Sequence, residues 1–155
     1  MYGDACSLRK LWEDISSKDM KNRDRIYKGV ISNWTNGHCV FSGETLEPRK
    51  VTKGDVKSFM EGEEECRLYY KTDQMVFGTS TLQPGKKGAV DPGHKNGYEI
   101  FYVAKGRVIC SFPRAKREEV LDEGDIVIIP PGEPHELTNS GTVEALVCWS
   151  LAPPD

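Results

Sequence analysis

The fold of this chain is decided by the stretch Gly124-Asp-Ile-Val-Ile-Ile-Pro130-Pro-Gly132-Glu-Pro-His135-Glu-Leu-Thr-Asn139. Gly124 begins a turn into an apolar strand. The prolines between 130 and 134 cannot donate to a strand ladder and force a bend, after which His135 opens the next strand. Alternation with a period of two places His135, Leu137 and Asn139 on one face of that strand, which we expect to face the interior.

A second informative stretch lies upstream, where Pro84-Gly85 is followed by Asp91-Pro-Gly-His94-Lys-Asn-Gly-Tyr-Glu99-Ile-Phe-Tyr-Val-Ala-Lys-Gly106. The same alternation puts Glu99, Phe101 and Val103 on one strand face and turns the tyrosines at 98 and 102 away from it. Gly106 then ends the strand at a turn.

The two stretches resemble the two motifs of the cupin superfamily. The downstream stretch matches G-x5-P-x-G-x2-H-x3-N at every fixed position, and the upstream one is similar to G-x5-H-x-H-x3,4-E-x6-G. The resemblance implies a small β-barrel whose lumen holds a divalent transition metal, with His94, Glu99 and His135 as ligands. It covers about half of the chain.

The upstream stretch has one histidine where the family motif has two. Counting back from Glu99 places Pro92 at the missing position, and counting forward from Gly85 places Asp91 there. A proline side chain cannot bind a metal, whereas a carboxylate can. The ligand set is therefore two histidines and one carboxylate, or that set with Asp91 added. Two imidazoles and a carboxylate with open positions suit iron, manganese, nickel or zinc.

The rest of the chain supports an all-β fold of the jelly-roll type. Short apolar runs separated by glycine and proline fill residues 66–155, which we expect to form the barrel. Residues 1–65 are predicted to be an extension that packs on it. We expect there a helix near residues 8–15, a hairpin within 26–41, a second short helix over 56–60 after a Thr52–Asp55 capping box, and a solvated loop at 61–65.

Composition excludes several classes of protein. A net charge of −3 gives no field that would attract nucleic acid or an anionic membrane. No apolar run approaches the roughly 20 residues of a membrane helix, and the N-terminus lacks an apolar signal core, so we expect a cytoplasmic protein. The five cysteines form no C-x-x-C pair, so we do not expect a zinc knuckle.

The predicted function is that of a metal-dependent enzyme acting on a small oxygen-rich metabolite, such as a hydroxy acid, keto acid or sugar derivative. Isomerisation or elimination is preferred over oxygen activation, and the sequence singles out no catalytic residue. Phe101, Asn139 and Trp149 are the candidates for substrate contacts, although Trp149 also suits the core and Asn139 also suits backbone groups at a strand end. The alternative is a non-catalytic module that binds a small molecule. Family habit further implies a homodimer.

Overall fold

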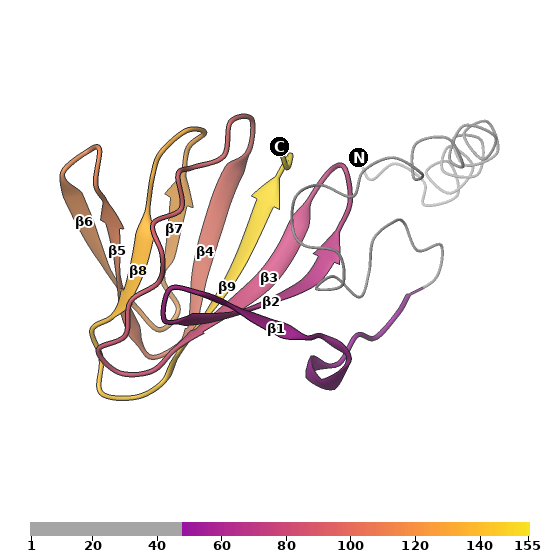
Figure 1. Cartoon of the computed structure of the whole chain (residues 1–155), viewed down its shortest axis with the longest axis horizontal. Coiled ribbons are helices and arrows are strands. Elements are labelled where there is room, and N and C mark those ends of the chain that lie inside the picture. Colours follow the sequence, from indigo (N-terminus) through magenta and orange to yellow (C-terminus); the bar gives the residue numbers. More distant parts are fainter. Residues whose placement is uncertain (1–47) are drawn as a thin grey trace, which may run out of the picture. The chain divides into compact units, whose positions relative to one another are not determined.

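The computed structural model describes residues 48–155, which form two antiparallel sheets facing each other (Figure 1). The larger sheet has the strand order β1-β2-β3-β9-β4-β7, and the smaller has the order β6-β5-β8. The strand bounds are β1 (Ser58–Glu61), β2 (Glu64–Lys71), β3 (Val76–Leu82), β4 (Tyr98–Lys105), β5 (Arg107–Phe112), β6 (Arg117–Asp122), β7 (Ile126–Ile129), β8 (Glu136–Asn139) and β9 (Ala145–Ala152).

The core lies between the two sheets because one face of each central strand is apolar. In β9 the buried residues are Ala145, Val147, Trp149 and Leu151, each separated by a residue that is only partly buried. β4 follows the same alternation, with Glu99, Phe101 and Val103 inward. Fully burying an apolar side chain of this size contributes about 1.5–3 kcal/mol, so the core between the sheets makes a large contribution to stability. The all-β, cupin-type barrel expected from the sequence is confirmed.

Residues 85–91 connect the two sheets along one side of the barrel. Isolated bridges join Gly88 to Gly62 in the turn between β1 and β2, and join Asp91 to His135 at the start of β8. The Asp91–His135 bridge carries two backbone hydrogen bonds, of 2.8 and 3.0 Å. Gly62 has φ +65°, and a Cβ there would lie 2.6 Å from the Ala89 nitrogen, so only glycine fits this crossing. This connecting segment, residues 85–91, forms one edge of the pocket described below.

Several expectations for the first part of the chain need correction. The Thr52–Asp55 capping box exists, but it caps a 3-10 helix of three residues, Lys53–Asp55. The predicted helix over 56–60 is wrong, because residues 58–61 form β1 and pair with β2. The predicted loop at 61–65 is also wrong: only residues 62 and 63 form the turn. The expected boundary between the extension and the barrel, at residues 65 and 66, therefore falls inside β2. The predicted helix near residues 8–15 and the predicted hairpin within 26–41 lie outside the described residues.

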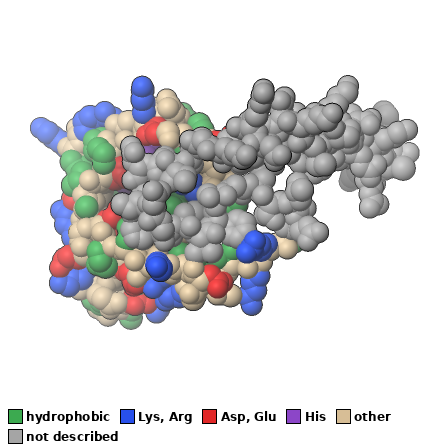
Figure 2. Space-filling view, turned by 45° about the vertical axis from the view of Figure 1, so that its right-hand side comes forward, with side chains coloured by type: hydrophobic (Ala, Val, Ile, Leu, Met, Phe, Trp, Pro, Cys, Tyr) green, Lys and Arg blue, Asp and Glu red, His purple; other side chains and the backbone are tan. Residues whose placement is uncertain are grey.

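Charged side chains of both signs are interspersed over the described residues on the face seen in Figure 2. β6 is an example, since its sequence REEVLD is largely exposed and it forms an edge of the smaller sheet. Charged residues on an edge strand oppose pairing with other chains. Among the described residues, no helix is long and apolar enough to span a membrane.

Candidate metal centre and pocket

Two histidines and one glutamate from separate parts of the chain meet inside the barrel. Glu99 is on β4, His135 immediately precedes β8, and His94 lies in the connection between β3 and β4. Glu99 Oε2 is 3.1 Å from His135 Nε2 and 3.4 Å from His94 Nε2. Glu99 and His135 are buried, with 6% and 3% of their surface exposed. The three residues predicted as ligands are thus brought together.

The Glu99 carboxylate is held in its charged form by the two imidazoles. Burial by itself would raise the pKa of Glu99, but His135 and His94 outweigh it and the pKa lies below its ordinary value. The pKa of His94 is raised, chiefly by Glu99. For His135, burial lowers the pKa, yet Glu99 and the Glu133 carbonyl together raise it above the ordinary value.

Glu99 Oε2 nevertheless has no hydrogen-bond partner of acceptable geometry, although it is buried. A buried oxygen without such a partner costs about 1–3 kcal/mol. Ligand atoms about 2.0–2.1 Å from one metal ion are separated by about 3.0–3.4 Å, depending on the coordination angle. The two nitrogen–oxygen distances around Oε2 fall at this spacing. Within residues 48–155, no three His, Cys, Asp or Glu side chains form a preassembled coordination shell, so a metal would require the side chains to adjust.

The second ring nitrogen of each histidine faces an oxygen. His135 Nδ1 is 3.0 Å from the Glu133 carbonyl oxygen. His94 Nδ1 is 3.7 Å from Asp155 Oδ2, and Asp155 accepts the backbone N–H groups of Lys95 and Asn96 at 2.8 Å each. Outer oxygens of this kind fix the tautomer and orientation of metal-binding histidines and leave the other nitrogen free to bind.

Asp91, the candidate for the additional ligand, lies at the same site. Its Oδ2 is 3.6 Å from His94 Nε2, and its Oδ1 accepts the Gly93 N–H at 2.7 Å. The bridge to His135 places its backbone beside that histidine. Of the two positions that the spacing left open, Asp91 is therefore the one with a suitable side chain near both histidines.

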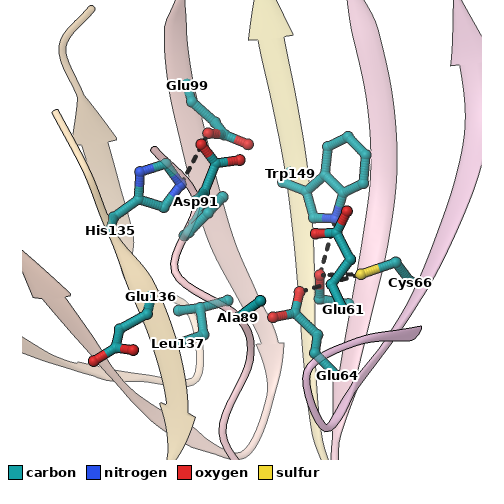
Figure 3. A pocket seen from close by; sticks show the side chains of 12 residues that line it. Glu61, Glu64, Cys66, Ala89, Asp91, Glu99, His135, Glu136, Leu137 and Trp149 are labelled. Atoms are coloured by element: carbon teal, nitrogen blue, oxygen red, sulfur yellow. Dashed lines mark hydrogen bonds and ion pairs between the residues drawn. The ribbon is translucent and has the colours of Figure 1, made fainter. Parts of the chain in front are cut away.

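A pocket opens beside this group and contains about 410 Å³ of space, counting the part open to solvent. Figure 3 shows His135 and Glu99 on one side of it and Glu64, Cys66 and Trp149 on the other. His94 does not line the pocket. The lining residues are Glu61, Glu64, Cys66, Ser80, Ala89, Asp91, Glu99, Phe101, His135, Glu136, Leu137 and Trp149.

Two of the three residues expected to contact a substrate line this pocket. Phe101 packs against His135 with ring centres 5.3 Å apart and an interplanar angle of 71°. The Trp149 indole N–H donates to Ser80 Oγ at 3.0 Å. Asn139 does not line the pocket. Its amide donates to the carbonyls of Leu82 and Val143 and accepts from Gly141, so all its polar atoms hold the backbone together.

Sequence reasoning missed the two glutamates at the beginning of the sheet. Glu61 ends β1 and Glu64 begins β2, and both line the pocket. The missed signal is the alternation Glu64, Cys66, Leu68, which continues the inward face of β2 back into the acidic run. Burial raises the pKa of Glu64 despite its hydrogen bonds with Ser80 and Cys66. Burial and the neighbouring carboxylates also raise the pKa of Glu61.

The residues that line the pocket have an excess of acidic groups. They include five carboxyl groups and one histidine but neither lysine nor arginine. Two nearby lysines do not line the pocket, and each is paired with a glutamate. Lys86 pairs with Glu63 and Lys87 with Glu136, each at 2.6 Å. The pocket therefore offers no basic side chain of its own to a negatively charged ligand.

Comparison with known proteins supports the fold. Residues 78–151 match the cupin domain family. An uncharacterized protein of Methanocaldococcus jannaschii is 33% identical over 85 residues, which make up 54% of this chain and 66% of that protein. The match covers less than two thirds of the length of that protein.

Solved structures share the fold at low identity. A double-stranded β-helix protein from Klebsiella pneumoniae superposes with a TM-score of 0.60 and 24% identity, covering 70% of this chain and 93% of that one. The polyketide cyclase RemF from Streptomyces resistomycificus gives a TM-score of 0.56 and 21% identity, covering 69% and 80%. The architecture is thus that of a double-stranded β-helix with a histidine–carboxylate cluster in its lumen. Residues 78–151 of this chain thus match a cupin domain, in agreement with that architecture.

Proposed function

We propose that this protein is a metal-dependent cupin enzyme that acts on a small, oxygen-rich metabolite by isomerisation or elimination. The observation that carries the proposal is the buried Glu99 Oε2, which faces two imidazole nitrogens at 3.1 and 3.4 Å without a hydrogen-bond partner of acceptable geometry. Such an arrangement fits a cation shared by the three side chains better than a set of hydrogen bonds.

The donor set fits a divalent transition metal. His94, Glu99 and His135 would hold it, and Asp91 is placed to join them. When bound, iron, manganese, nickel or zinc would polarise substrate oxygens as a Lewis acid. The protein itself contributes a buried carboxylate, imidazoles oriented by Glu133 and Asp155, and aromatic walls from Phe101 and Trp149 that limit water around the substrate.

The remaining pocket chemistry favours proton transfer. Glu61 and Glu64 have raised pKa values, which bring a carboxyl group closer to the pH at which it can both accept and give a proton. Isomerisation and elimination both need such a group, whereas oxygen activation has no requirement for it. The alternative, a non-catalytic binding module, predicts a lumen that is apolar apart from the motif residues. The extra carboxyl groups are the observation against that alternative.

Elemental analysis by mass spectrometry tests the proposal. The protein is purified without added metal or chelator, beside a His94→Ala, His135→Ala double variant and a Glu123→Gln control. Glu123 is exposed in the turn between β6 and β7. We expect close to one transition metal ion per chain in the wild type and in the control, and almost none in the double variant. Circular dichroism of all three checks that they are folded.

Absence of metal from the purified protein would contradict the proposal. If neither the wild type nor the control contains metal, and neither takes up iron, manganese, nickel or zinc on titration, the metal-dependent mechanism fails. The binding module would then be the better account of the pocket.

A further inference from the structure

Glu64 is a buried carboxyl group that belongs to no ligand position and has a defined set of partners. It is 9% exposed at the start of β2. The Cys66 thiol donates to Glu64 Oε1 at 3.4 Å, and the Ser80 hydroxyl also bonds to this carboxyl group. Because Ser80 Oγ accepts the indole N–H of Trp149, its own proton is available to Glu64. The carboxyl group is thus oriented by three other pocket residues.

The connecting segment restricts the second oxygen of the same carboxyl group. A Cβ placed on Gly88 would lie 2.2 Å from Glu64 Oε2, so the absence of a side chain at Gly88 is what leaves room for that oxygen. Gly88 is also bonded on both sides, to Gly62 by a bridge and to the Leu137 carbonyl through its N–H. Glu64 therefore has a fixed position in the wall of the pocket.

The opposite side of the pocket holds the proposed metal ligands. Figure 3 shows Glu99 and His135 across the pocket from Glu64. Glu99 Oε2, in a side chain more than nine-tenths buried, has no hydrogen-bond partner of acceptable geometry. A molecule in the pocket would therefore contact the ligand group on one side and the Glu64 carboxyl group on the other.

We propose that Glu64 is the catalytic acid–base residue of this pocket, and that its substrate is an uncharged compound with a hydroxyl group next to a carbonyl group. The inference rests on the proposed metal-dependent function. It narrows the substrate class because five carboxyl groups and no lysine or arginine line the pocket, so an anionic group would be repelled everywhere except at a bound metal ion. Hydroxy acids and keto acids are correspondingly disfavoured, while sugars and related polyhydroxy carbonyl compounds suit a pocket rich in hydrogen-bond acceptors.

The chemical step balances without another reactant. The Glu64 carboxylate takes the proton from the carbon that bears the hydroxyl group. The C–H electron pair becomes the C=C bond of an enediolate, the carbonyl oxygen receives the displaced pair and the proton of the neighbouring hydroxyl, and the negative charge remains on the oxygen that gave up this proton. Glu64 then returns its proton to the former carbonyl carbon, and the second oxygen becomes the new carbonyl group. The product is an isomer of the substrate.

Deuterium exchange tests this assignment with simple probe compounds that carry the required hydroxyl and carbonyl groups. Wild-type protein with its native metal is incubated in D2O with dihydroxyacetone, xylose or glucose, and with the anion hydroxypyruvate. NMR spectroscopy follows deuterium entering the carbon beside the carbonyl group. We expect exchange above the buffer rate with at least one uncharged probe and a much lower rate with hydroxypyruvate.

Variants then separate the role of Glu64 from a structural one. Glu64→Gln keeps the shape and should lower exchange by roughly 10²-fold or more, because general acid–base groups contribute about that much. Gly88→Ala keeps the carboxyl group but displaces it, and should also lower exchange. Both should retain the metal, as should the Glu123→Gln control, which should keep wild-type exchange. The dependence of the exchange rate on pH should show one ionisation fewer in Glu64→Gln than in the wild type. The other titratable groups that face Glu64 are Glu61, Glu99 and His135, and these remain in the variant.

The results that overturn the inference differ from those that overturn the proposed function. Metal-loaded wild type without exchange on any uncharged probe, or Glu64→Gln with undiminished exchange, overturns the acid–base assignment while leaving the metal site intact. Loss of metal from folded Glu64→Gln also overturns it, because Glu64 would then be a ligand. Wild-type protein that binds no metal overturns the proposed function itself.

Discussion

Gly78 of β3 and Trp149 of β9 face each other in register, and the indole lies where a side chain on Gly78 would stand. A Cβ on Gly78 would be 2.2 Å from Trp149 Cζ2. The φ of Gly78 is not in the left-handed region, so space and not backbone conformation requires glycine here. Trp149 lies flat against β3 and directs its N–H to Ser80, so the shape of the pocket depends on this glycine.

Gly78→Ala should therefore disturb both stability and pocket. Forcing extra volume into a packed interior costs about 1–3 kcal/mol, and the moved indole would lose its bond to Ser80. We expect a lower midpoint of thermal unfolding, measured by circular dichroism, and a changed near-ultraviolet signal. Gly54→Ala is the matched control, since the nearest atom to its Cβ would be 3.8 Å away. An unchanged midpoint for Gly78→Ala would show that the indole moves at no cost.

Asp155 is predicted to position His94 for metal binding. Its carboxylate holds the Lys95 and Asn96 N–H groups and lies 3.7 Å from His94 Nδ1. Replacing a group that orients a metal-binding histidine typically weakens metal affinity about 10- to 100-fold. Asp155→Ala should do so in competition with a chelator, while leaving thermal stability of the metal-free protein nearly unchanged. If Asp155→Ala binds metal as tightly as the wild type, Asp155 does not position His94 for metal binding.

Metal-free protein should lose stability as the pH rises above neutrality. The pKa values of His94 and His135 are raised, so their contribution is complete below the ordinary value of 6.5 and disappears as the pH passes their folded values. The pKa of Glu99 is lowered, so its contribution is complete above its ordinary value of 4.5 and is lost as the pH falls through the folded value. The cluster thus stabilises most between these two ordinary values.

Thermal unfolding of chelator-treated protein between about pH 5 and about pH 9 measures this dependence. Glu99→Gln should flatten the decline above neutrality, since the glutamine cannot stabilise a protonated imidazole. Adding metal should reverse the trend, because metal competes with protons for the histidines and binds more tightly as the pH rises. Equal slopes for the wild type and Glu99→Gln without metal would contradict the prediction.

A homodimer remains a prediction, and the structure indicates the face to test. β7 is an edge of the larger sheet. The outward side of β4 and β7 exposes large apolar residues: Tyr98, Ile100, Tyr102, Ile126 and Ile128. Packing of this face against the same face of a second copy would be symmetric and would cover these side chains. We expect the mass of a dimer from light scattering and the mass of a monomer for Ile128→Lys. The control variant Val120→Lys changes an exposed residue of β6 outside this face, and this protein should remain a dimer. A wild-type protein that is a monomer at high concentration would exclude the interface.

The ligand candidates came from the resemblance of two stretches of sequence to the cupin motifs. Alternation added that Glu99 shares a strand face with Phe101 and Val103, and the structure shows that this face is buried. The chemistry of the side chains already favoured Asp91 over Pro92, but the structure was required to show that the backbone of Asp91 pairs with His135, more than 40 residues away in the chain. No pattern within one segment contains that pairing.

The acidic wall of the pocket was not predicted because charge and burial give conflicting signals there. A run of glutamates normally indicates a solvated loop, yet Glu64 continues the inward face of β2 and is enclosed by the connecting segment. β6 shows the same conflict in an exposed strand. Its charged sequence has little strand character of its own, and it is held by pairing with β5, including the Arg107–Asp122 ion pair at 2.6 Å.

The connecting segment also has a consequence for the order of folding. Local hairpins such as β1–β2 and β5–β6 can form early, because their partners are close in the chain. The bridges from residues 85–91 to Gly62 and to His135 join segments about 25 and 45 residues apart, so their closure costs more entropy than a local hairpin and we expect them to form later. Partly folded chains would then lack the cluster around Glu99. A metal ion that binds there selects the completed molecule and stabilises it by mass action, in proportion to the logarithm of its free concentration.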